Sequence, residues 1–343
     1  NYLFTDRNDA KALEMMKGPI GTAVMNPEYT EEANIGFRAA YCDDATQEKY
    51  LNMIAEQFAN YPCELQTFEG NRTTELLKTN AGANGSNNDD AVTVEVGNLI
   101  KVAPPLRITF DRRRKHNTLV CGTNERMSEN ILNMFAFFVL KNTKASMYCF
   151  DGERLLGPSN ADRVYAAFAK MSGRFRIAES RGNIIEYVNE IYDLYSERKK
   201  HGGGDSVFVF IKNLQYLDLI KSMFKGDMID ESEYLDNVQQ SVDAFDFGSD
   251  VSSLGVSEKM LKIIDDGTAY GIHIVVSSPE YQSVKESMYF GENILAKFPE
   301  RFVFSLNDSD AESLIEGVSV TSLRDNTVYY TDSVKNTFQL KPY

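Results

Sequence analysis

Apolar runs recur along the chain after residue 90, and helical patterns separate them. The runs that predict core strands are Asn117–Cys121, Ser146–Phe150, Ser206–Ile211, Ile272–Ser277 and Arg301–Ser305. Almost wholly apolar strands that alternate with helices are typical of a parallel sheet with helices on both faces. Two further runs, Val92–Val96 and Leu106–Phe110, alternate between apolar and polar residues and predict half-buried strands. The pattern therefore predicts an α/β fold.

Helical spacing predicts three helices between these strands. They cover Ser128–Leu140, Ala161–Met171 and Asn183–Lys199. The first is apolar on most faces, which indicates burial, and Ser128 is the residue that we expect to cap its N-terminus. Residues 225–254 are acidic and contain Ser and Gly, which indicates a surface insertion.

The N-terminal part is a smaller unit, with strands predicted at Gly21–Met25 and Ile35–Tyr41 and a helix at Thr46–Phe58. A segment of this size buries little apolar surface by itself. Residues 79–90, TNAGANGSNNDD, contain almost nothing to bury and predict a flexible linker. The predicted domains are therefore an appendage at 1–78, a linker at 79–90 and a main module at 91–343.

Composition narrows the class of protein. With 343 residues, 43% of them hydrophobic, the chain is long and apolar enough for a folded core, which excludes a disordered chain. The net charge of −14 disfavours a broad nucleic-acid-binding face. One dense basic run, RRRK at residues 112–115, contacts nucleic-acid phosphate in one interpretation. In the other, which we prefer, it is the solvated tip of a hairpin.

Neither the cysteines nor the histidines are spaced like ligands of a metal. They are Cys42, Cys63, Cys121, Cys149, His116, His201 and His273. Without CxxC pairs, neither a metal site nor a disulfide framework is predicted, and free thiols fit a reducing cytoplasm. No run reaches the length of a membrane span, and no signal peptide is visible. We predict a cytoplasmic location, with any membrane association through parts of a larger parent protein.

The loop after Asn117–Cys121 stands where nucleotide-binding proteins carry the motif GxxxxGK[ST]. In that motif backbone N–H groups cradle phosphate, the lysine neutralises it and the hydroxyl holds Mg²⁺. The residues here are Gly122, Thr123, Asn124, Glu125, Arg126, Met127, Ser128 and Glu129. Met127 replaces the second glycine, Ser128 the lysine and Glu129 the hydroxyl. Glu125 and Glu129 would repel a triphosphate, so a simple capped strand-to-helix turn is preferred over a working nucleotide site.

The strand Ser206–Ile211 provides a second test. Active NTPases place acidic residues after this strand, where they hold Mg²⁺ and polarise the attacking water. Here Lys212 and Asn213 follow. A lysine ammonium cannot ligate a cation, and an asparagine amide cannot act as a base. Both stretches therefore indicate a fold that is kept while its catalysis is lost.

Together these stretches resemble the FtsK/SpoIIIE family of P-loop motor ATPases. The resemblance rests on Pro104–Ile131 around the degenerate loop, on SVFVFIKNLQYL at Ser206–Leu217, on DDGTAYGIHIVVSSPEY at Asp265–Tyr281 and on KFPERFVFSLNDSDAESLIEG at Lys297–Gly317. Gly271-Ile272-His273 is its most specific part. It implies a RecA-like parallel sheet.

The resemblance also covers the two ends of the chain. Residues 18–58 look like the closing hairpin and helix of a preceding module, and Glu312–Tyr343 like the closing part of this one. It implies a tandem multi-ATPase protein, such as the EssC-like ATPases of type VII secretion or a DNA translocase. The implied partners are neighbouring ATPase modules, a secreted-protein signal or DNA, and oligomers would form through the parent protein.

The resemblance leaves several alternatives for function. Because the lysine, the Ser/Thr and the acidic residues are replaced, we predict a non-catalytic module with a structural, regulatory or partner-docking role. An active DNA translocase or secretion ATPase with an atypical nucleotide site, and a DNA-binding module, remain alternatives. No cofactor is firmly predicted, although weak docking of ATP and Mg²⁺ stays open. Arg301 matches a family position from which an arginine finger reaches a neighbour's nucleotide; the alternative is an ion pair at the strand end.

Overall fold

The computed structural model describes residues 14–26, 34–60, 91–101, 103–113, 116–159, 161–226, 254–288, 294–323 and 326–342. The chain forms two units, Asn1–Leu65 and Gln66–Tyr343. The predicted linker at 79–90 and nearly all of the predicted insertion, at 227–253, lie outside the described residues. Within the described part, no helix is both long and apolar enough to cross a membrane.

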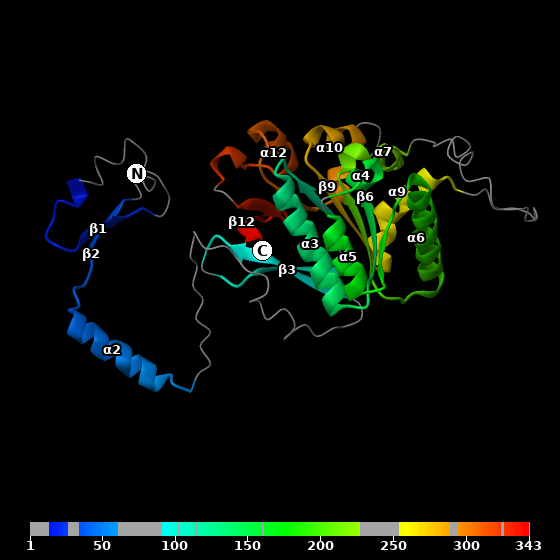
Figure 1. Ribbon diagram of the computed structural model, residues 1–343. Helices are drawn as coiled ribbons and strands as arrows, with labels where there is room; N and C mark the ends of the chain where they lie inside the picture. The colour runs from blue at the N-terminus through cyan, green and yellow to red at the C-terminus, as the bar shows by residue number, and fades with distance from the viewer. Residues whose placement is uncertain are drawn as a thin grey trace, which may run out of the picture. The chain divides into compact units, whose positions relative to one another are not determined.

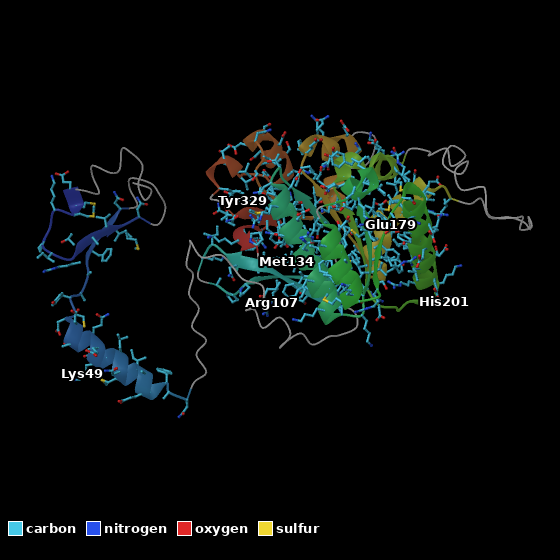
Figure 2. The ribbon with its side chains drawn as sticks, viewed as in Figure 1. Lys49, Arg107, Met134, Glu179, His201 and Tyr329 are labelled. Carbon is cyan, nitrogen blue, oxygen red and sulfur yellow. The ribbon has the colours of Figure 1, made fainter. Side chains whose placement is uncertain are left out.

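The described residues of the first unit include an antiparallel pair of strands and a helix. Strands β1 (Thr22–Met25) and β2 (Ile35–Arg38) pair with Thr22 opposite Arg38. Helix α2 (Asp44–Gln57) begins after Asp43, whose carboxylate accepts the N–H of Thr46 at 2.9 Å. Figure 2 shows the side chains around α2, Lys49 among them, and none of the described side chains of this unit is buried. Its described residues therefore form no core of their own.

The second unit is built on one ten-stranded sheet, in the order β4-β3-β12-β11-β10-β5-β9-β8-β6-β7. The strands are β3 (Ala91–Leu99), β4 (Leu106–Asp111), β5 (Thr118–Cys121), β6 (Ser146–Asp151), β7 (Phe175–Ile177), β8 (Val207–Lys212), β9 (Ile272–Ser278), β10 (Glu300–Val303), β11 (Val328–Thr331) and β12 (Thr337–Pro342). From β10 to β7 all neighbours are parallel, and from β10 to β4 all are antiparallel.

The five predicted core strands correspond to β5, β6, β8, β9 and β10, and their parallel pairing is confirmed. Numbered one to five along the chain, they lie in the order 5-1-4-3-2. The chain therefore leaves β5 through α3, passes over β9 and β8, and returns in β6. This arrangement is the RecA-like sheet that was predicted. It brings the carboxyl ends of β5, β9, β8 and β6 to one edge.

Helices cover both faces of the parallel strands (Figure 1). On one face α3 (Glu125–Asn142) and α5 (Asp162–Met171) pack against a core that includes Phe208 and Phe302. On the other, α6 (Arg181–His201), α7 (Asp218–Lys225) and α9 (Val256–Asp266) pack against a core that includes Ile211 and Ile274. Strand residues alternate between the two cores, which is why these strands are apolar throughout. The remaining helices are α4 (Gly152–Leu156), α10 (Tyr281–Met288), α11 (Ile294–Lys297) and α12 (Asp308–Leu314).

One sequence-based expectation differs from the structure, and one strand pairing was not predicted. Arg112 and Arg113, the described residues of the basic run, do not lie at a hairpin tip: they follow β4, which pairs with β3 and is not a neighbour of β5. The first residue of the run, Arg112, is half-buried and donates from Nη2 to the carbonyl of Gly204. The sequence also did not predict that β11 and β12 close one edge with β3 and β4. Their short, mixed patterns carry no signal of which strands they pair with.

Candidate functional site

Gly122 directly follows β5, and a side chain at this position would clash with Phe304. Its N–H donates to the carbonyl of Ser278 at 3.1 Å. A Cβ at Gly122 would lie 2.2 Å from the carbonyl oxygen of Phe304 and 2.5 Å from its ring. The glycine is therefore required by close packing against the segment after β10. The Thr123 hydroxyl donates to the carbonyl of Ser305, which ties the loop to the same segment.

The rest of the loop is helix. Asn124 caps α3: its side-chain oxygen accepts the N–H of Met127 at 3.1 Å, and its carbonyl accepts the N–H of Ser128 at 3.0 Å. The prediction that Ser128 is the N-cap is therefore wrong, because Asn124, four residues earlier, serves that role. Glu125 and Arg126 are exposed in the first turn. The chain here turns directly into the helix at Glu125.

Met127, at the position of the motif's second glycine, is buried. Its side chain is 7% exposed and belongs to the core between α3 and the sheet. A glycine at this point lets a loop wrap closely around phosphate. A buried methionine instead anchors the first turn of the helix. The first turn of α3 is therefore held by packing of Met127 against the core.

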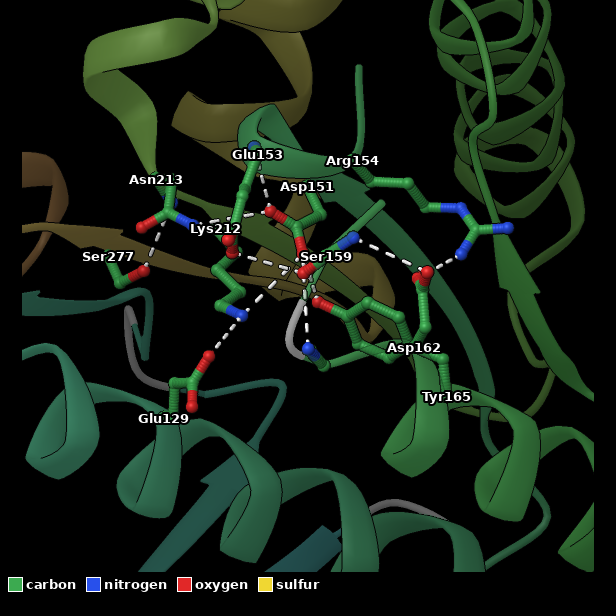
Figure 3. Close-up of polar contacts among 11 residues, drawn as sticks. Glu129, Asp151, Glu153, Arg154, Ser159, Asp162, Tyr165, Lys212, Asn213 and Ser277 are labelled. Carbon is green, nitrogen blue, oxygen red and sulfur yellow. Dashed lines mark hydrogen bonds and ion pairs between the residues drawn. The ribbon is translucent and has the colours of Figure 1, made fainter. Parts of the chain in front are cut away.

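Lys212 and Glu129 contact each other directly (Figure 3). Lys212 ends β8, and its Nζ lies 2.8 Å from Oε1 of Glu129 and 3.5 Å from Oδ2 of Asp151. Burial lowers the pKa of Lys212, but Asp151 and Glu129 raise it by more, so the pKa lies above the ordinary lysine value. The lysine is therefore a buried cation held between two carboxylates.

Asp151, at the end of β6, is the centre of the network and was not predicted. It is fully buried, and its Oδ2 accepts hydrogen bonds from the hydroxyls of Tyr165 and Ser159. Its Oδ1 accepts the N–H of Glu153 at 3.0 Å and the side-chain amide of Asn213 at 3.3 Å. Burial, together with Asp151, raises the pKa of the Tyr165 phenol, which stays a donor. A lone Asp at the end of an apolar strand was the available sequence signal.

Asn213 has a structural role at this edge. It is left-handed, with φ of 58°, and its N–H donates to the Ser277 hydroxyl of β9 at 3.3 Å. A Cβ on Gly152 would approach the Asn213 carbonyl to 2.6 Å. Asn213 therefore joins the ends of β8, β9 and β6. Left-handed backbone is tolerated best by Gly, Asn and Asp.

The fold would place Mg²⁺ and a triphosphate at this edge, but the residues do not fit them. The ammonium of Lys212 lies between Glu129 and Asp151 and occupies the space between these two carboxylates. Among the described residues, no group of three or more His, Cys, Asp or Glu is arranged to hold a metal ion. The donor set therefore supports an internal ion pair and no metal-assisted step.

The other residues singled out from the sequence lie away from this network. Arg301, in β10, donates from Nη1 to the carbonyls of Leu295 and Phe298 at 3.1 and 3.2 Å, and so caps the end of α11. It forms no ion pair with a described carboxylate, so the ion-pair interpretation does not describe this conformation, whereas the arginine finger stays a prediction. His273 is buried, and burial, helped by nearby His116, lowers its pKa to about 3. It is a neutral core residue.

Comparison with known proteins identifies the class of fold. No family model and no curated protein matches the chain. Solved structures do match: the pCW3 conjugation coupling protein TcpA with ATPγS has a TM-score of 0.52 at 13% identity over 73% of this chain and 65% of that one. ATPases 2 and 3 of Thermomonospora curvata EccC, in complex with a signal sequence peptide, have a TM-score of 0.53 at 11% identity over 94% and 53%.

A third match is the cytoplasmic domain of EssC, with a TM-score of 0.55 at 11% identity over 90% of this chain and 55% of that one. The fold is therefore shared with these ATPase structures, in agreement with the RecA-like sheet that the sequence resemblance implies. The chain spans between about half and two-thirds of the length of these proteins. At these identities the likeness shows the fold alone.

Proposed function

We propose that residues 91–343 are a catalytically silent ATPase-fold module that serves as a structural, regulatory or partner-docking part of an ATP-driven translocase. The observation that carries the proposal is the ion pair of Lys212 with Glu129 at 2.8 Å. In an active site of this class a cation bridges the nucleotide and the protein carboxylates. Here the lysine takes that place, so the site is stable without nucleotide.

The proposal extends to the first unit. Its β1–β2 hairpin is antiparallel, like β11–β12, and in the second unit β11–β12 completes the sheet by pairing with β10 and β3. We propose that residues 1–78 are the closing part of a preceding module. That preceding module would be the main partner of residues 91–343. A cargo of secreted protein fits the likeness to EccC and EssC, and a cargo of DNA fits that to TcpA.

Nucleotide binding and hydrolysis test the proposal. The purified chain is titrated with a fluorescent ATP analogue with and without Mg²⁺, and phosphate release is followed at steady state. We expect no Mg²⁺-dependent binding and no release above a buffer blank. Mg²⁺-dependent turnover by the unmodified chain would contradict the proposal.

A restored variant sharpens the test. It carries Met127→Gly, Ser128→Lys, Glu129→Ser and Lys212→Asp, which return the loop and the end of β8 to the motif. Because the structure pairs positions 129 and 212, both must change together. Gain of nucleotide binding in this variant supports a fold that has kept its shape and lost only the residues that bind nucleotide. The matched charge control is Lys170→Asp, because Lys170 is an exposed lysine on α5.

A further inference from the structure

A cavity of about 720 Å³ lies beside the start of β10, at the opposite end of that strand from the Gly122 loop. Its walls come from the end of α11, from the segment that ends α12 and from the turn between β11 and β12. Arg301 is the one arginine among its lining residues. A volume of this size is within the range of small-ligand sites.

Arg301 is held rigidly but its charge is not neutralised by the protein. Nη1 is fixed by the two carbonyls at the end of α11, whereas Nε is buried without an acceptor. Nη2 forms no hydrogen bond with a described residue. Burial lowers the pKa of Arg301, and the charge of Glu300 only partly opposes this. A half-buried guanidinium without a carboxylate partner is costly unless an anion completes it.

Two of the three carboxylates that line the cavity, those of Glu312 and Asp332, accept hydrogen bonds from backbone N–H groups. Glu312 accepts the N–H of Gly317 at 3.0 Å, and Asp332 accepts two backbone N–H groups of its own turn, Val334 at 3.0 Å and Asn336 at 2.8 Å. Glu316 is exposed, and Lys335 contributes a second cation to the lining. Because acidic side chains lie beside the partly buried arginine, a phosphate dianion would be repelled more strongly than a singly charged anion.

We propose that this cavity binds a carboxylate-bearing ligand, whose carboxylate pairs with the guanidinium of Arg301. The planar guanidinium matches a carboxylate with two parallel hydrogen bonds. Nε and Nη2, which have no acceptor among the described residues, are the donors left for such a ligand. A free chain terminus and an Asp or Glu side chain offer the same chemistry. The site is separate from the Lys212 network and does not depend on the nucleotide site being silent.

Side-chain NMR of the full chain, labelled with ¹⁵N at arginine, tests the proposal. The Nε–H signal of Arg301 is assigned by its loss in Arg301→Lys. The probes are acetyl-trialanine with a free C-terminal carboxylate, an amidated acetyl-tripeptide with a central aspartate, the amide of acetyl-trialanine, and inorganic phosphate. We expect a saturable shift of this signal with one or both carboxylate probes and none with the neutral amide.

Two variants provide matched controls. Arg301→Lys keeps the charge but removes the planar fork, and we expect about tenfold weaker binding of the carboxylate probe. Glu316→Gln removes a like charge, and we expect about twofold tighter binding. Thermal unfolding shows whether each variant is folded. Equal binding of the amide, preference for phosphate, or no saturable shift in the folded wild type would overturn the proposal.

Discussion

Lys212 Nζ lies 2.8 Å from Oε1 of Glu129, so an ion pair joins the end of β8 to α3. The pair is completed by Asp151, which is fully buried. This relationship makes the edge of the sheet sensitive to the loss of either partner.

Replacing Lys212 by Met should strongly destabilise the module. The lysine side chain is 8% exposed, and its removal leaves the buried Asp151 carboxylate without a cation. Breaking a buried pair in this way costs about 3–5 kcal/mol of unfolding free energy. Urea unfolding followed by circular dichroism measures the change.

Lys170→Met is the control for this variant, because Lys170 is exposed on the neighbouring helix α5. It should change the free energy of unfolding by no more than about 0.5 kcal/mol. If Lys212→Met unfolds at the same urea concentration as the wild type, the ion pair does not stabilise the edge.

Gly122→Ala should destabilise the module through overpacking. The new Cβ would meet the Phe304 carbonyl at 2.2 Å, and backbone on both sides has to move. We expect a loss of about 1–3 kcal/mol in urea unfolding. Gly173→Ala is matched to it, since a Cβ there meets nothing within 4 Å, and its effect should be small. Equal effects of the two substitutions would argue against the close packing.

His273 should make the stability fall in acid. Its pKa is lowered to about 3 in the folded state, chiefly by burial, while the unfolded chain has a value near 6.5. Between these values the unfolded state binds the proton and the folded state does not, so unfolding is favoured as the pH falls. The slope is about 1.4 kcal/mol per pH unit. Above pH 6.5 the group has no effect.

The test compares urea unfolding of the wild type and His273→Gln at pH 7 and pH 5. We expect the wild type to lose about 2 kcal/mol more than the variant over this range. Other titrating groups affect both proteins alike, so they cancel in the difference. Parallel pH dependence of the two would show that His273 does not resist protonation.

The segment 1–78 should not unfold cooperatively when it is expressed alone. Its described residues include no buried side chain, and apolar residues of α2 such as Tyr50 and Ile54 are 57% and 53% exposed. Calorimetry should show no heat-absorption peak for this fragment, whereas residues 91–343 should show one. A sharp transition in the short fragment would mean that it has a core of its own.

The sequence by itself determined the parallel core and the loss of the nucleotide motif. Strands such as Val207–Lys212 are apolar on both faces because both are covered, and that pattern is local and readable. The absence of a lysine at Ser128 is equally local. The start of α3 was placed three residues late, because Asn124 and Ser128 are both good caps and only packing of Met127 against the core selects between them.

The tertiary structure alone decided which of these residues meet. Glu129 and Lys212 are 83 positions apart, and their pairing depends on α3 crossing over β9 and β8 before the chain returns. Asp151 became the centre of the network because β6 lies beside β8, with Asp151 opposite Lys212. Residue types and periodicity fix the local elements, but contacts between distant strand ends follow from sheet order, which local patterns do not encode.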